Sequence, residues 1–110
     1  MRIDLGSMPD TKISGLYGGT GEITARIYEG EGIKVIPRRI HPGGSIGMHR
    51  HDESEEINYI LYGNGVAVCD GVEEMLATDV CHICPKGSEH SIANTGMVDL
   101  VILTVVASKR

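Results

Sequence analysis

The sequence predicts an all-β fold, built as a sandwich or barrel within a single domain. The chain has 110 residues, the length of one domain, and its 15 glycines fall mostly between short apolar runs. Val and Ile dominate these runs, as is typical of β-strands, and no run has the periodicity of a convincing helix. Short strands separated by frequent turn signals indicate an all-β sandwich or barrel.

The elements follow in order along the chain. Residues 1–21 are expected to form an N-terminal arm and loop without regular structure, and residues 22–110 the barrel domain. Strands are expected at residues 22–28, 33–41, 55–62, 66–69, 72–76, 80–84, 90–93 and 98–107. Pro37 marks the second strand as an edge strand or the site of a bulge. Asp70-Gly71 is a hairpin signal, and the last strand is a continuous apolar run, typical of burial on both faces.

Composition and charge argue against several classes of partner. The net charge is −5 and the pI is near 5.4, so no basic surface is expected for nucleic acid or for anionic lipid. The N-terminus has no long apolar run, so neither a signal peptide nor a membrane span is expected and the default location is the cytoplasm. Three cysteines fit a reducing compartment. Cys81 and Cys84 would face opposite sides of a strand, so this C-x-x-C is interpreted as accidental and its thiols as free and buried or half-buried.

Histidines and a carboxylate form the pattern that says most about chemistry. His49 and His51 are two residues apart, so a β-strand would place both imidazoles on one face. Glu56 follows shortly after, and His90 comes from a second strand-and-turn segment. Three neutral imidazoles and one carboxylate form a mixed nitrogen and oxygen site that suits Mn, Fe, Co, Ni, Cu or Zn. A six-coordinate ion would retain positions for water and substrate.

These residues belong to two longer patterns. The first reads Gly43-x5-His49-x-His51-x4-Glu56-x6-Gly63, and the second reads Pro85-x-Gly87-x2-His90-x3-Asn94. They resemble the two motifs of the cupin family, G-x5-H-x-H-x3–4-E-x6-G and G-x5-P-x-G-x2-H-x3-N. The second motif departs at its start, where Asp79 stands in place of glycine. The resemblance covers about residues 33–106.

The resemblance implies a single cupin domain, a double-stranded β-helix of the jelly-roll type with one divalent transition metal ion inside. It also implies the four ligands of that ion, which are His49, His51, Glu56 and His90. Glu55 is the competing carboxylate, but in a strand it faces away from Glu56, and only Glu56 keeps the motif's interval to Gly63. Cupins with this ligand set include oxygenases, decarboxylases, isomerases and lyases.

Strand alternation adds candidates for a pocket on the strand that carries Glu56. If Glu56 points inward, then Asn58 and Tyr62 do so too, unless a bulge intervenes. Asn58 would hydrogen-bond either a ligand carboxylate or a bound substrate. The alternative is an inward amide satisfied by backbone or water.

Two further residues have open assignments. Arg38 shares the aliphatic face of its strand and would lie inside the barrel mouth, where a guanidinium can clamp a carboxylate or phosphate. Alternatively, it is solvated like its neighbour Arg39. His82 lies on the same strand face as Cys84 and is interpreted either as an acid or base of the pocket or as a structural or surface histidine.

Three functions fit this pattern. The first is a small metalloenzyme acting on a small polar organic molecule, and the second is a non-catalytic binding or sensor module that acts through a partner. The third is a structural role in which the metal only stabilises the barrel. A homodimer is also expected, because the N-terminal arm could cover an open sheet edge of a neighbouring copy.

Overall fold

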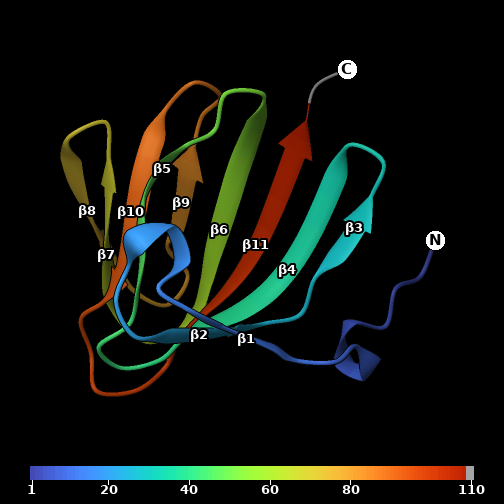
Figure 1. The fold of residues 1–110 in the computed structure, drawn as a ribbon, viewed down its shortest axis with the longest axis horizontal. Coiled ribbons are helices and arrows are strands. Elements are labelled where there is room, and N and C mark those ends of the chain that lie inside the picture. The colour runs from blue at the N-terminus through green and yellow to red at the C-terminus, as the bar shows by residue number, and fades with distance from the viewer. Residues whose placement is uncertain (109–110) are drawn as a thin grey trace.

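The protein is built almost entirely from antiparallel strands, as a computed structural model over residues 1–108 describes it (Figure 1). In chain order the elements are η1 (Leu5–Ser7), β1 (Thr11–Ser14), η2 (Leu16–Gly18), β2 (Glu22–Ala25), β3 (Tyr28–Gly30), β4 (Ile33–Ile40), β5 (Ser45–Arg50), β6 (Ser54–Tyr62), β7 (Gly65–Cys69), β8 (Val72–Leu76), β9 (Cys81–Cys84), β10 (Glu89–Asn94) and β11 (Leu100–Ser108). Residues 109–110, which the predicted barrel domain includes, lie outside the described residues.

The strands form two packed sheets. One has the order β1-β2-β4-β11-β6-β9, with β3 also paired to β4, and the other has the order β5-β10-β7-β8. The prediction of an all-β jelly-roll fold is confirmed. The cupin motifs lie on both sheets, since β6 belongs to the larger sheet while β5 and β10 belong to the smaller one. Packing of the two sheets therefore brings together motif side chains from distant parts of the sequence.

Aliphatic side chains fill the space between the sheets, as expected for a chain without Phe or Trp. The buried members of this core are Ile23, Ile40, Ile46, Ile60, Ala67, Leu76, Ile92, Leu100 and Ile102. On β11 the buried residues alternate with half-buried ones, so the prediction that this strand is buried on both faces is wrong. The outer face of β11 lacks a covering layer among the described residues, and its apolar side chains remain partly accessible.

The N-terminal segment is more regular than expected. Ile13 of β1 pairs with Ile23 of β2, so this part of residues 1–21 is a strand of the larger sheet. The loop with η2 packs against β5 (Figure 1). The expectation of an arm without regular structure is therefore wrong, because backbone pairing and burial of Ile13 against the core hold the segment in place. No helix within residues 1–108 is long and apolar enough to cross a membrane.

The strand expected over residues 22–28 is divided into β2 and β3. Both halves pair with β4 in one register, and Arg26 lies opposite Pro37 at the break. The Arg26 N–H donates to the Pro37 carbonyl over 3.0 Å, but Pro37 has no N–H to return the bond. Pro37 therefore interrupts the ladder inside the sheet and does not mark an edge strand.

Asp79 occupies the position at which the family motif has glycine. Its φ is 72°, in the left-handed region that glycine adopts without strain and that Asp tolerates better than most residues. The Tyr59 hydroxyl donates to the Asp79 carboxylate, and the Asp79 N–H donates to the Ile60 carbonyl. The turn thus keeps the conformation that the motif glycine would provide.

Candidate metal centre

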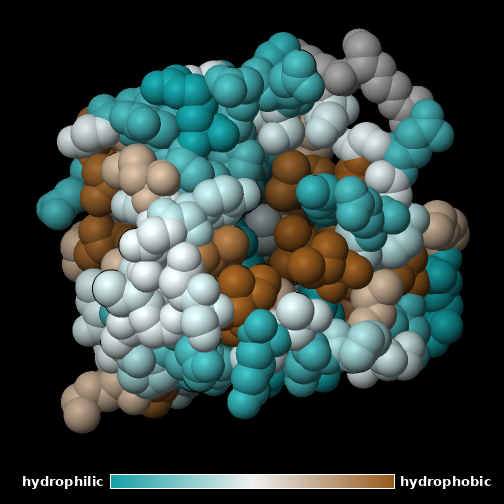
Figure 2. All heavy atoms as spheres, in the orientation of Figure 1, coloured by the Kyte–Doolittle hydropathy of each residue, from teal (hydrophilic) through white to brown (hydrophobic). Residues whose placement is uncertain are grey.

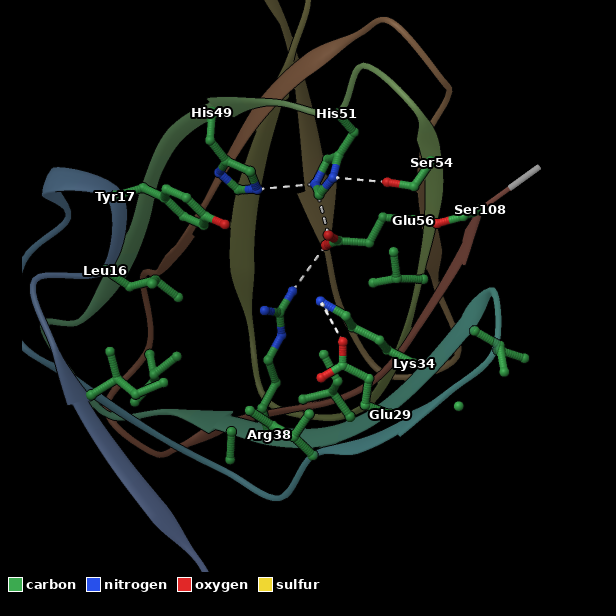
Figure 3. Close-up of a pocket in the computed structure, with 18 of the residues that line it drawn as sticks. Leu16, Tyr17, Glu29, Lys34, Arg38, His49, His51, Ser54, Glu56 and Ser108 are labelled. Atoms are coloured by element: carbon green, nitrogen blue, oxygen red, sulfur yellow. Dashed lines mark hydrogen bonds and ion pairs between the residues drawn. The ribbon is translucent and has the colours of Figure 1, made fainter. Parts of the chain in front are cut away.

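Three histidines and one carboxylate meet in the barrel, at the level next to the aliphatic core. They form the His₃Glu cluster, which consists of His49, His51, Glu56 and His90. One possible ligand atom from each residue lies within 4.8 Å of all the others, so the cluster could hold a metal ion. His49 on β5 and His90 on β10 are direct cross-strand partners. Figure 3 shows His49, His51 and Glu56 directed toward one another across the two sheets.

The ring nitrogens converge closely. His49 Nε2 lies 3.1 Å from His51 Nε2 and 3.2 Å from His90 Nε2. His51 Nε2 lies 2.8 Å from Glu56 Oε2, and His90 Nε2 lies 3.5 Å from Glu56 Oε1. Each of the three imidazoles therefore presents its Nε2 to one small volume that the carboxylate also faces.

The opposite ring nitrogens already have partners outside this volume. His49 Nδ1 donates to the Gly47 carbonyl over 2.8 Å, which leaves its Nε2 unprotonated in the neutral ring. His51 Nδ1 lies 3.4 Å from Ser54 Oγ, and His90 Nδ1 lies 2.8 Å from His82 Nε2. Nitrogen lone pairs that face one another at such distances suit a shared cation, and the donor set fits a divalent transition metal.

Electrostatics keep the cluster in a ligand-competent state. Burial lowers the pKa of His90 to about 4, although the nearby Glu56 opposes this shift. Burial also lowers the pKa of His49, against its hydrogen bond to Gly47. Burial alone would raise the pKa of Glu56, but the hydrogen bond with His51 and the charge of Arg38 outweigh it and hold that pKa far below its usual range. At neutral pH, His49 and His90 are therefore neutral imidazoles, each with a lone pair for a metal ion, and Glu56 is an anion.

Arg38 is buried beside the cluster. Its side chain rises from β4 (Figure 3), and Nη2 donates to Glu56 Oε1 over 2.9 Å and to Asn58 Oδ1 over 3.1 Å. Its Nε is buried and has no hydrogen-bond acceptor among residues 1–108. Arg38 therefore points into the barrel and is not solvated, whereas its neighbour Arg39 is half-exposed.

Asn58 is fully buried one level deeper than Glu56. Its Oδ1 accepts from Arg38 and from Thr104 Oγ1, the latter over 2.8 Å, and its Nδ2 lies 3.5 Å from the His82 carbonyl. These partners occupy the amide and hold the Arg38 guanidinium against Glu56. Asn58 thus acts on the cluster through Arg38 and does not line the cavity in front of it.

His82 is fully buried and stacks on His90, with ring centroids 5.1 Å apart. Its Nδ1 lies 2.8 Å from Glu74 Oε1, so this nitrogen carries the ring proton and donates a hydrogen bond to the carboxylate. His82 Nε2 can then accept from His90 Nδ1, which leaves His90 Nε2 free to face the cluster. His82 is therefore neither a pocket residue nor a surface residue, because it lies behind a candidate ligand.

Tyr62 is not in the site, and the expectation that it points inward is wrong. The register between β6 and β11 shifts between Val101 and Ile102, which pair with Tyr62 and Ile60. This bulge ends the strict alternation beyond Ile60, and the Tyr62 side chain is 60% exposed. The sequence pattern allowed for a bulge but did not locate one.

Tyr17 is a site residue that strand reasoning missed. Its ring stacks on His49 with centroids 4.1 Å apart and an interplanar angle of 13°. Its φ of 52° is left-handed, and its carbonyl lies so near Gly47 that a Cβ there would come within 2.1 Å. The surrounding run of glycines at Gly15, Gly18 and Gly19 was the available signal for a tightly folded loop.

A cavity of about 420 Å³ opens in front of the His₃Glu cluster. Tyr17, Arg38, His49, His51 and Glu56 line its inner end (Figure 3). The cluster therefore borders a space large enough for an organic ligand. Cys81 and Cys84 lie on alternate faces of β9, so the C-x-x-C does not form a paired site. Cys84 is buried as expected, but the expectation of a buried or half-buried thiol is wrong for Cys81, which is exposed because it lies on the outer face of its strand.

Comparisons with known proteins agree with this geometry. Residues 38–106 match the family described as "Cupin domain". A protein named "Oxalate-binding protein" from Thermotoga maritima is 38% identical over 102 residues, which cover 86% of this chain and 84% of that protein. The crystal structure of a "predicted oxalate decarboxylase" from the same organism has a TM-score of 0.92 at 29% identity, covering 99% of this chain and 100% of that one.

A more distant structure shares the fold alone. The Cnp3 cupin domain of Schizosaccharomyces pombe has a TM-score of 0.80 at 15% identity, covering 96% of this chain and 72% of that one. The chain belongs to the cupin domain family.

Proposed function

We propose that this protein binds one divalent transition metal ion in the His₃Glu cluster and uses it to bind and activate a small organic acid anion. The observation that supports this most directly is the convergence of three Nε2 atoms and one carboxylate at one end of an open cavity. The ligands would be His49, His51, Glu56 and His90. Mn, Fe, Co, Ni, Cu and Zn all suit this donor set.

The charge around the cluster supports an anionic ligand. A divalent ion and the Arg38 guanidinium together outweigh the single Glu56 carboxylate, so the inner end of the cavity attracts anions. The name of the Thermotoga maritima relative, which refers to oxalate binding, supports a carboxylate in particular. A bound metal would supply Lewis acidity by polarising a carboxylate or carbonyl oxygen of the ligand.

The protein's own residues would orient that ligand. Arg38 is held rigid by Glu56 and Asn58, so it presents a fixed positive charge and not a mobile one. Tyr17 covers His49 and directs its hydroxyl into the cavity (Figure 3), where it can donate a hydrogen bond to a bound anion. Both groups line the cavity, so both could act on the ligand directly.

Catalysis is the first candidate function of this site, and ligand binding without turnover is the second. The open cavity beside the cluster favours an enzyme, because a ligand could reach the metal from that side. The second reading is favoured by the relative whose name describes binding only. The donor set is compatible with decarboxylase, dioxygenase, isomerase and lyase chemistry.

The test begins with protein purified without chelators or added metal. Elemental analysis should find about one equivalent of a transition metal, and the His49→Ala variant should lose most of it. The metal-loaded protein is then screened for turnover and oxygen uptake with oxalate and other small acids. Turnover supports the enzyme, whereas thermal stabilisation by an acid without turnover supports the binding module. Wild-type protein that takes up none of the candidate metals would contradict the proposal.

We also propose a homodimer, formed through the outer face of the larger sheet. Two cross-strand rows make this face apolar: Pro37, Leu103 and Tyr59 in one, and Val35, Val105, Ile57 and Ile83 in the other. All of these residues are half-buried or exposed, and none is charged. Because β1 pairs with β2 of its own chain, the sheet face is a better candidate interface than the N-terminal arm.

A further inference from the structure

The cavity in front of the His₃Glu cluster changes character along its length. Its inner end carries His49, His51, Glu56 and Arg38, whereas most of its remaining wall is aliphatic. The aliphatic wall includes Ile13, Leu16, Ile27, Ile33, Ile36 and Val106. Ile13 comes from β1, Leu16 from η2 and Val106 from β11. Ile27 immediately precedes β3, and Ile33 and Ile36 lie on β4. Among residues 1–108, the outer part of the cavity therefore offers a second carboxylate no charged partner apart from the rim pair described next.

One ion pair lies at the rim of the cavity. Lys34 Nζ is 3.7 Å from Glu29 Oε2, and both side chains are largely exposed to solvent (Figure 3). Glu29 largely neutralises the charge of Lys34, so the pair provides little attraction for an anion at the outer end. With the proposed divalent ion bound, the excess positive charge would lie at the inner end, where Arg38 is buried against Glu56.

Two large aliphatic side chains remain exposed at the rim. Ile27 is 44% exposed and Ile33 is 41% exposed, and both line the cavity. Figure 2 shows apolar residues on both sides of a hollow near the middle of this face. Apolar surface beside a cavity is stabilised when a ligand covers it, because burial removes that surface from water.

The size of the cavity also exceeds what the smallest acids need. A volume of about 420 Å³ lies within the range of roughly 300–1,000 Å³ that is common for sites of larger organic ligands. Oxalate consists of two joined carboxylates with no apolar carbon, so it could fill the inner end but would leave the aliphatic wall uncovered. The wall therefore fits a longer molecule with one polar end.

We propose that the ligand of this site is a monocarboxylic acid with an apolar tail, bound with its carboxylate at the cluster and its tail along the aliphatic wall. This inference rests on the proposed metal site, which would hold the carboxylate together with Arg38. The tail contacts Ile36 and Val106 on its way out and covers Ile27 and Ile33 at the rim. Ligand selection by chain length then follows from apolar burial and not from additional charge.

The experiment titrates Co²⁺-loaded protein with acetate, butanoate, hexanoate and oxalate, and follows the visible absorption of the cobalt ion. Each added methylene should tighten binding about three- to fourfold until the tail reaches the rim, as expected for a buried CH₂ group. Hexanoate should therefore bind far more tightly than acetate, and more tightly than oxalate. Affinity that stays flat or falls along the series would overturn the proposal.

Rim variants test the location of the tail. The double variant Ile27→Asn with Ile33→Asn should weaken hexanoate binding several-fold and leave acetate binding unchanged. The matched control is Val98→Asn, because Val98 is 48% exposed but does not line the cavity, and it should change neither. Hexanoate binding that is unaffected by the double variant would also overturn the proposal.

The outcomes separate this inference from the proposed function. Cobalt uptake with acetate and oxalate binding but no gain along the series contradicts only the apolar tail. A protein that takes up no cobalt contradicts the metal site itself. A cobalt-loaded protein that binds none of the four acids contradicts both the carboxylate ligand and the tail.

Discussion

His82 Nε2 lies 2.8 Å from His90 Nδ1, so a fully buried histidine stands directly behind a candidate metal ligand. On its other side, His82 Nδ1 lies 2.8 Å from the carboxylate of Glu74, whose side chain is 41% exposed. The chain of contacts runs from the surface of β8 to the centre of the barrel. It fixes the ring orientation of His90 and makes His90 Nε2 a better electron donor.

Replacing His82 should weaken metal binding without unfolding the barrel. His82→Phe keeps a buried ring but removes the acceptor for His90 Nδ1, so metal affinity should fall about 10- to 100-fold. Competition with a chromogenic chelator measures this affinity. Glu74→Gln should cause a smaller loss in the same direction, and Glu73→Gln on the exposed neighbour should cause none. Wild-type affinity in His82→Phe would show that the contact does not support the ligand.

Removing Arg38 should destabilise the protein through the groups it leaves behind. Arg38→Gln leaves the buried Glu56 without its cationic partner, and loss of such a pair costs about 3–5 kcal/mol. Urea unfolding of the metal-free protein measures the change. Arg39→Gln is the matched control, because the pair of Arg39 with Asp10 is half-exposed and 3.7 Å long, and its loss should cost less than about 1 kcal/mol. Equal losses would contradict the buried network.

Acid should destabilise the metal-free protein from about pH 6.5 downward. The pKa of His90 is about 4 in the folded protein, below the ordinary value of 6.5. Between pH 6.5 and pH 4, His90 therefore binds a proton in the unfolded chain but not in the folded one. Stability therefore falls as pH decreases through this window, by ~3 kcal/mol at pH 4 from His90 alone. The depressed pKa of Glu56 acts in the same direction, with its contribution lost at lower pH as the carboxylate protonates.

Thermal unfolding of metal-free protein between pH 4 and pH 8 checks this expectation. The His90→Gln variant should have a flatter profile than the wild type between pH 6.5 and pH 4. A wild-type profile that is flat across this range would contradict the lowered pKa of His90.

Asp79 should tolerate glycine better than alanine. Alanine at a φ of 72° costs about 1–2 kcal/mol, whereas glycine adopts this conformation freely. Urea unfolding should therefore show Asp79→Ala to be clearly less stable than Asp79→Gly. Tyr59→Phe removes only the hydrogen bond to Asp79 and isolates its share. Equal destabilisation by Gly and Ala would assign the role of Asp79 to its side chain and not to its backbone.

A charge on the outer face of the larger sheet should dissociate the proposed dimer. Leu103 lies in the middle of this face, between Pro37 and Tyr59, so Leu103→Glu would bury a carboxylate in the interface. Light scattering after size exclusion should give a dimer for the wild type and a monomer for the variant. Met75→Glu, at an exposed position on β8, is the control and should remain dimeric. A monomeric wild type would contradict the interface.

Local pattern was sufficient for much of the fold and for the identity of the cluster residues. Alternation along single strands predicted that His49 and His51 share a face, and that Cys81 and Cys84 do not. The same rule failed at Tyr62, because a bulge shifts the register, and bulges depend on pairing with another strand. The break between β2 and β3 also depends on pairing with another strand, because it lies at Arg26, opposite Pro37 of β4.

The sequence by itself determined which side chains are available to a metal and the approximate strands that carry them. Only the tertiary structure decided that Tyr17 stacks on His49, that Arg38 turns inward to Glu56, and that His82 supports His90. These contacts join segments far apart in the chain. They depend on strand register and on how the two sheets pack, and periodicity within one segment carries no information about either.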